Sequence, residues 1–151
     1  MGLKELTEQE KVESAKLLAA YWKDRSMPEY DETWAREYLE EGHKKETKLD
    51  EFFVYKEGEK TIGTISLITD VSDIAEIRDM VLKPEYRNKG YGRKMLDEIV
   101  GLAGARKIRK LYAFIFPQFE EMYQSAGFEK EGILKSHFAA GEDLTIMSRF
   151  L

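Results

Sequence analysis

The chain has 151 residues and a mass of 17.6 kDa, the size of one ordinary domain built around a single core. Hydrophobic residues make up 42% and charged residues 35%, which excludes a disordered tail or a fibrous protein. The sequence has no cysteine and two histidines, so disulfides, thiolate metal sites and acyl-cysteine chemistry are excluded, and we expect no metal. The formal charge of −5 and the absence of a long apolar run predict a cytoplasmic protein that binds neither nucleic acid nor membrane.

The first third of the chain predicts two helices. The capping box Thr7–Glu10 precedes apolar residues at helical spacing and indicates a helix over residues 8–24. Aromatic and apolar residues from Trp34 to Leu39 indicate a second helix, which Gly42 ends. The polar segment GHKKETK that follows is typical of a loop.

The rest of the chain predicts six strands and two further helices. The runs EFFVYK and TIGTISLI form a hairpin around Gly58, and a third strand, IAEIRDMVL, ends before Pro84. A helix over residues 90–105 follows, then the apolar strand LYAFIF and a short helix that begins near Pro117 and ends at Gly127. The runs GILKSHFAA and LTIMSRFL form the closing hairpin.

This order, α-α-β-β-β-α-β-α-β-β, predicts an α/β (α+β) fold in which a mixed, mostly antiparallel sheet carries helices on both faces. No repeat and no Pro/Gly/Ser-rich linker divides the sequence. We therefore expect a single domain over residues 1–151.

The most informative segment is the turn Arg87-Asn88-Lys89-Gly90-Tyr91-Gly92, between the third strand and the following helix. Glycines let the backbone approach a ligand, and the start of a helix offers unpaired N–H groups and the positive end of its dipole. Residues 83–94 hold five basic residues and one acid, a local charge of +4 in an acidic protein. The segment therefore predicts an anion site, and a pyrophosphate fits it better than a single phosphate.

The sequence resembles the GNAT superfamily of acetyl-CoA-dependent N-acetyltransferases. The turn RNKGYG is similar to the family's pyrophosphate loop, IAEIRDMVLKPEYR to its preceding strand, and LYAFIF with MYQSAGF to the strand and helix behind the thioester. The resemblance is clearest over residues 50–130, and the opening helices and closing hairpin fit the family's order. It implies that CoA or acetyl-CoA is the co-substrate and that the fold is GNAT-like.

The resemblance also assigns residues to the cofactor and to the chemistry. The implied cofactor-binding residues are Met80, Val81, Leu82, Arg87, Asn88, Lys89, Gly90, Tyr91, Gly92 and Arg93, with the pantetheine arm lying as an added strand beside Val81. Tyr123 falls at the position of a tyrosine that hydrogen-bonds the leaving sulfur, and Glu76 at the position of a carboxylate base. Phe116 stands where the family commonly has asparagine, so we expect one pantetheine contact to be missing or replaced.

The sequence leaves open which groups act as the base, stabilise the oxyanion and assist the leaving sulfur. Glu76 is either the base or a structural partner of Arg78, and Asp79 or a water chain is the substitute base. Strand alternation predicts that Glu76 and Asp79 point to opposite faces unless a bulge intervenes. A backbone N–H near Val81 would stabilise the oxyanion, and Tyr123 is a hydrogen-bond donor rather than a full acid, since phenols are weaker acids than thiols.

Two histidines and an acidic segment complete the candidates. His137 is a base or, with more weight, a structural residue, and His43 belongs to a solvated loop. Residues 24–41 carry a net charge of −5 among aromatic residues, typical either of a lid that attracts a cationic amine or of a packed face with a solvated edge.

We therefore expect an acyltransferase that moves an acetyl group from acetyl-CoA to a primary amine by direct transfer in a ternary complex. Two alternatives remain: a non-catalytic CoA-binding, sensing or assembly module, and a protein acetyltransferase acting on lysine or N-terminal amines rather than on small molecules. The acceptor is a small-molecule or peptide amine, and a homodimer through the terminal hairpin is compatible with the sequence but not required by it.

Overall fold

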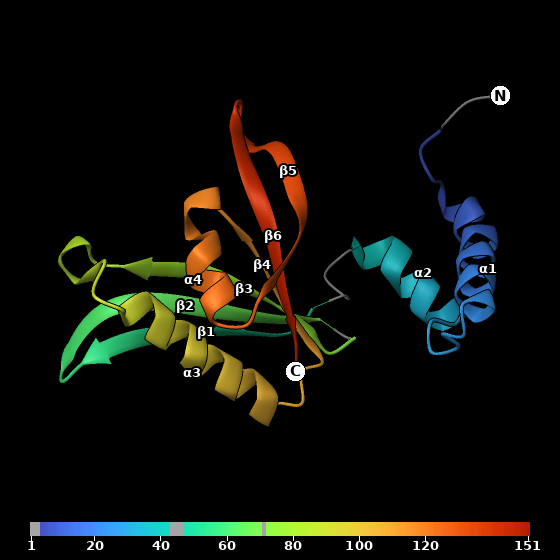
Figure 1. Cartoon of the computed structure of the whole chain (residues 1–151). Coiled ribbons are helices and arrows are strands. Elements are labelled where there is room, and N and C mark those ends of the chain that lie inside the picture. Colours follow the sequence, from blue (N-terminus) through green and yellow to red (C-terminus); the bar gives the residue numbers. More distant parts are fainter. Residues whose placement is uncertain (1–3, 43–46, 71) are drawn as a thin grey trace. The chain divides into compact units, whose positions relative to one another are not determined.

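The computed structural model describes residues 4–42, 47–70 and 72–151. By their internal contacts these residues form two compact units, one up to residue 46 and the other from Thr47 to Leu151. Figure 1 labels the elements of both units, which are described separately below. None of the described helices is long and apolar enough to cross a membrane.

The first unit consists of helices α1 (Glu8–Asp24) and α2 (Glu32–Glu41). The predicted capping box starts α1, because the Glu10 carboxylate accepts hydrogen bonds from the N–H and hydroxyl of Thr7 at 2.9 and 2.8 Å. Asp31 caps α2 by accepting a hydrogen bond from the N–H of Trp34 at 2.9 Å. Gly42 ends α2 with a φ of 65°, which favours glycine.

The second unit is built on a six-stranded sheet. Its strands are β1 (Thr47–Glu57), β2 (Lys60–Asp70), β3 (Ile74–Leu82), β4 (Lys110–Ile115), β5 (Glu129–Ala139) and β6 (Glu142–Phe150). Their order across the sheet is β1-β2-β3-β4-β6-β5, and only β3 and β4 are parallel. The connection between these two strands passes through a helix, as parallel neighbours require.

Helices α3 (Tyr91–Ala105) and α4 (Glu120–Ser125) pack on one face of this sheet. The apolar side of α3 and the buried residues of β2, β3, β4 and β6 form one continuous core with Tyr123 and Phe128. Short 3-10 turns precede both helices, at Pro84–Tyr86 and Pro117–Phe119. The core therefore holds α3, through Met95, Leu96, Ile99 and Ala103, and α4, through Tyr123, against the sheet.

The two halves of the sheet part soon after they meet. Parallel pairing of β3 with β4 covers only Ile74–Glu76 against Lys110–Tyr112. Beyond that contact, strands β1–β3 and β4–β6 extend in different directions, as Figure 1 shows. The far end of β3, from Ile77 to Leu82, and the far end of β4 therefore leave a gap between them in the sheet.

The predicted order of helices and strands and the mixed, mostly antiparallel sheet are confirmed. The single domain over residues 1–151 stays a prediction. The placement of helices on both faces also stays a prediction, because it depends on α1 and α2.

Candidate active site

The predicted anion site is the turn that leads into α3, and its backbone N–H groups precede the hydrogen bonds of the helix. Asn88 and Gly90 have φ values of 56° and 85°, so the turn has two residues in the left-handed region before the helix begins. The helical hydrogen bonds begin at the N–H of Lys94, which donates to the carbonyl of Gly90 at 3.2 Å. The N–H groups of the first turn of α3 therefore have no carbonyl of their own helix to bond, as at any helix start.

Side chains around the turn hold it in place. Arg87 donates from Nε to the carbonyl oxygen of Leu82 at 2.9 Å, which ties the turn to the end of β3. Arg93 bonds to Asp97 at 3.0 Å and to the Ser125 hydroxyl at 2.9 Å, which links the start of α3 to the end of α4. Tyr91 donates its hydroxyl hydrogen to Glu57 of the β1–β2 hairpin. Three neighbouring elements thus fix the geometry of the turn.

Gly92 lies close to two methionine side chains, which would have to move to admit a Cβ atom. A Cβ atom on Gly92 would lie 2.8 Å from Sδ of Met122 on α4 and 3.5 Å from Cε of Met80 on β3. This close approach lets the start of α3 and α4 flank the parted end of β3. The backbone N–H groups at the start of α3 could hold an anion, and the unpaired edge of β3 beside them could pair with an extended chain.

Tyr123 on α4 is buried in the core, with 3% of its surface exposed. Its ring packs edge-on against Phe128 at 5.2 Å, and its hydroxyl lies 3.7 Å from the thioether sulfur of Met80. Burial raises the pKa of the Tyr123 phenol well above its usual value of 10.0. A neutral hydroxyl that already points at a sulfur atom beside the gap is suited to donate a hydrogen bond to sulfur, and unsuited to release its proton.

A bulge in β3 changes the faces on which its acids lie. Ser66 pairs with Arg78 but Thr64 pairs with Val81, so β3 contains one extra residue between these pairs. The extra residue lies at Asp79, where φ is 53°, and the hydroxyl of Ser66 donates to the Asp79 carboxylate at 2.7 Å. The exception foreseen for strand alternation is therefore present, and Asp79 shares the face of Ser66 and Arg78.

Glu76 is buried, with 6% of its surface exposed, and has two partners. One of its oxygens lies 2.6 Å from the Arg78 guanidinium and 3.4 Å from the Tyr112 hydroxyl. Burial, and then the Glu76 charge, raise the pKa of Tyr112, so this phenol stays a hydrogen-bond donor. The ion pair with Arg78 that the sequence left open is thus formed.

Two predicted contributors have simpler surroundings. His137 is exposed on β5 and its ring centre lies 6.2 Å from that of Phe114. Phe116, at the position of the family's asparagine, packs edge-on against Phe138 at 4.9 Å.

His43 lies outside the described residues. Across the described parts of the chain, no three acidic or histidine side chains are grouped to hold a metal ion.

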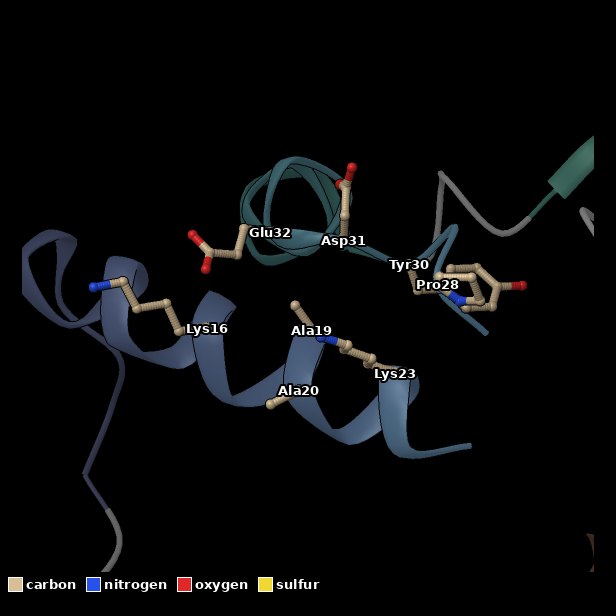
Figure 2. A pocket seen from close by; sticks show the side chains of 8 residues that line it. All are labelled: Lys16, Ala19, Ala20, Lys23, Pro28, Tyr30, Asp31 and Glu32. Atoms are coloured by element: carbon tan, nitrogen blue, oxygen red, sulfur yellow. The ribbon is translucent and has the colours of Figure 1, made fainter. Parts of the chain in front are cut away.

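The aromatic and acidic segment belongs to the first unit. Its rings contact one another in succession at 4.7 to 5.3 Å, in the order Tyr21, Trp22, Tyr30, Trp34 and Tyr38. A pocket of about 230 Å³ lies between α1 and the start of α2, and Figure 2 shows lysines of α1 and acids of α2 at its edge. The pocket residues are Lys16, Ala19, Ala20, Lys23, Pro28, Tyr30, Asp31 and Glu32. The contacts support the packed alternative, and the lid role stays a prediction.

Sequence reasoning missed two contributors to the site, Ser66 and Tyr112, and it missed the contact between the predicted residue Met80 and Tyr123. Ser66 and Tyr112 reach the acids of β3 from β2 and β4, and Met80 meets the Tyr123 hydroxyl. These contacts depend on the register of neighbouring strands and on the bulge. The only signal in the sequence is weak: a serine within an otherwise apolar run of β2.

Comparisons with known proteins agree with this geometry. The Acetyltransferase (GNAT) family matches residues 16–128. Over 72 residues the chain is 31% identical to the GCN5-related N-acetyltransferase 2, chloroplastic, of Arabidopsis thaliana, which corresponds to 48% of this chain and 28% of that protein. The chain thus spans well under two thirds of the length of this relative.

Solved structures show the same fold at low sequence identity. A Bacillus subtilis acetyltransferase in complex with CoA is 17% identical with a TM-score of 0.62, covering 99% of this chain and 97% of its own. A GNAT family acetyltransferase from Elizabethkingia anophelis with acetyl-CoA bound is 18% identical with a TM-score of 0.63, covering 76% and 82%. The resemblance inferred from the motifs is confirmed, and the chain belongs to the Acetyltransferase (GNAT) family.

Proposed function

We propose that the protein transfers an acetyl group from acetyl-CoA directly to a primary amine within a ternary complex. The observation that carries this proposal is that an anion-binding helix start lies beside an unpaired strand edge. The N–H groups at the start of α3 adjoin the end of β3, where that strand has parted from β4. A phosphate site beside an unpaired strand edge suits a ligand that has a diphosphate at one end and an amide chain at the other.

The turn Arg87–Arg93 would hold the diphosphate. Its N–H groups and the positive end of the α3 dipole favour negative charge, and Lys89 and Lys94 add positive charge beside it. Met80, Val81 and Leu82 would hold the amide chain through backbone groups on the gap side of β3. Family members with CoA or acetyl-CoA bound support the choice of ligand, although they share fewer than one residue in five with this chain.

Different groups of the chain would then accept the proton of the amine and stabilise the charges that develop on oxygen and sulfur. Acetyl-CoA supplies the activated acyl carbon, and an uncharged amine attacks it. Glu76 would accept the proton that the amine nitrogen must lose, with Asp79 on the same face as the substitute base. A backbone N–H near Val81 would stabilise charge on the thioester oxygen, and Tyr123 would donate a hydrogen bond to the departing sulfur.

Isothermal titration with CoA tests the proposal. We expect a dissociation constant of at most tens of micromolar, weakened by Lys89→Ala and left unchanged by Lys16→Ala, which removes the same charge from the first unit. No binding in that range would contradict the proposal. Release of free thiol from acetyl-CoA across a panel of amines tests catalysis, and tight CoA binding without thiol release would favour the sensing alternative.

A further inference from the structure

Aromatic side chains line one side of the gap in the sheet, on the face that carries the proposed base. Leu111, Ala113 and Ile115 of β4 are buried in the core beneath α3, so alternation places Tyr112 and Phe114 on the opposite face. We call Tyr112, Phe114, Phe116, His137 and Phe138 the aromatic row.

The aromatic row is continuous with Glu76. The Tyr112 hydroxyl lies 3.4 Å from the Glu76 carboxylate, and the Tyr112 and Phe114 rings are 5.7 Å apart. Phe114 in turn meets His137 at 6.2 Å. Phe116, two residues beyond Phe114, forms a second ring pair with Phe138, with ring centres 4.9 Å apart. A substrate whose amine reaches Glu76 therefore has its remaining atoms beside these rings.

The rings of the row are accessible although they are apolar. Phe114 is 40% exposed and Phe138 is 64% exposed within the part of the chain that the structure describes. Covering such rings with an apolar ligand surface is favourable, whereas a ligand rich in hydroxyl or ammonium groups would lose hydration there without gaining partners. The carboxylates of Glu76 and Asp79 on this face favour an acceptor that carries a positive charge.

We infer that the acceptor is a primary amine with an aromatic or bulky apolar body and no second charge, of the arylalkylamine class. This inference rests on the proposed function and names the acceptor for the same site. Tyr112 contacts Glu76, and Phe114 follows Tyr112 by two residues on the same face of β4, so an aromatic body attached to the amine by a short chain would reach these rings. Phe116 supports the choice, because its ring packs against the exposed ring of Phe138 and adds apolar surface on this side.

The test compares 2-phenylethylamine with ethylamine, spermidine and glucosamine as acceptors. We expect kcat/KM for 2-phenylethylamine to exceed that for ethylamine by about tenfold, and to exceed those for the other two amines. Phe138→Ala and Phe114→Leu should each lower it about fivefold or more while changing kcat/KM for ethylamine less than twofold. Phe150→Ala, an equally exposed ring over Lys110 on β6, is the matched control and should change neither.

A binding measurement separates this inference from the proposed function. Protein saturated with CoA is titrated with 2-phenylethylamine and, separately, with spermidine, whether or not either amine is acetylated. Binding of 2-phenylethylamine that Phe138→Ala weakens supports the inference even without turnover. Preference for spermidine or glucosamine, equal losses with ethylamine, or no binding of 2-phenylethylamine would overturn it. Failure of CoA itself to bind would instead overturn the proposed function.

Discussion

Replacing Gly63 by alanine tests how tightly β2 and β3 must approach beside the cofactor edge. Gly63 is buried on β2 and pairs with Leu82 of β3. An added Cβ would lie 2.7 Å from the carbonyl oxygen of Val81, 2.9 Å from Cδ2 of Leu82 and 3.5 Å from Cε of Met95. The Leu82 and Met95 side chains can move, but the Val81 carbonyl belongs to the backbone. The substitution therefore forces β3 itself to shift.

The expected cost follows from overpacking a close-packed core, about 1–3 kcal/mol of the free energy of unfolding. For a chain of this size each kcal/mol lowers Tm by about 2–4 °C. Because the displaced atom lies on the strand proposed to bind pantetheine, we also expect CoA affinity to fall. Denaturant unfolding gives the first quantity, and calorimetric titration with CoA gives the second.

Gly101→Ala is the matched control for this substitution. Gly101 is exposed within α3 and a Cβ there would meet nothing within 4 Å. Alanine should therefore raise the stability by about 0.5–1 kcal/mol through its higher helix propensity, and it should leave CoA affinity unchanged. The reasoning is refuted if Gly63→Ala is as stable as the parent protein and binds CoA equally well.

Three further predictions concern the proposed site. Tyr123→Phe and Glu76→Gln should each lower kcat by about 100-fold while leaving the dissociation constant of CoA within a factor of two to three, measured by thiol release and calorimetric titration. Gly90→Ala should weaken CoA binding and destabilise the fold by about 1 kcal/mol, because its φ of 85° strains any side chain. Since burial raises the Tyr123 pKa above 10.0, the folded state keeps a proton that the unfolded chain loses, so the free energy of unfolding should fall as pH rises above 10.0. Tyr123 contributes at most about 1.4 kcal/mol per pH unit to this fall, which Tyr123→Phe should reduce in denaturation measured from pH 9 to 11.

Each of these predictions has an outcome that contradicts it. An unchanged kcat in Tyr123→Phe or Glu76→Gln would remove that residue from the chemistry. For Gly90→Ala, CoA binding equal to that of the parent would show that the turn is not the diphosphate site. An alkaline stability profile unaltered by Tyr123→Phe would mean that the phenol ionises as easily in the folded as in the unfolded protein.

The order of elements could be predicted from the sequence because its signals are local. A capping box at Thr7, positive φ at Gly58 and Gly90, and prolines at 84 and 117 each depend on neighbours within a few residues. The turn before α3 was recognisable for the same reason, since its glycines and basic residues are consecutive. These features constrain the backbone wherever the segment lies in the fold.

The surroundings of the proposed base could not be predicted, because they depend on contacts distant in the sequence. Tyr112 meets Glu76 across 36 residues, and Ser66 meets Asp79 across 13. A single extra residue in β3 decides the face on which Asp79 lies, and no residue pattern identified the position of that bulge in advance. The short contact between β3 and β4 likewise follows from the twist and register of the whole sheet.

A crystal structure of the protein with CoA would test the central claim most directly. We expect oxygens of the diphosphate to accept hydrogen bonds from backbone N–H groups of residues 88–93, with the pantetheine arm running along Met80–Leu82 between β3 and β4. A diphosphate bound elsewhere on the protein, or an arm that does not enter between these strands, would contradict it.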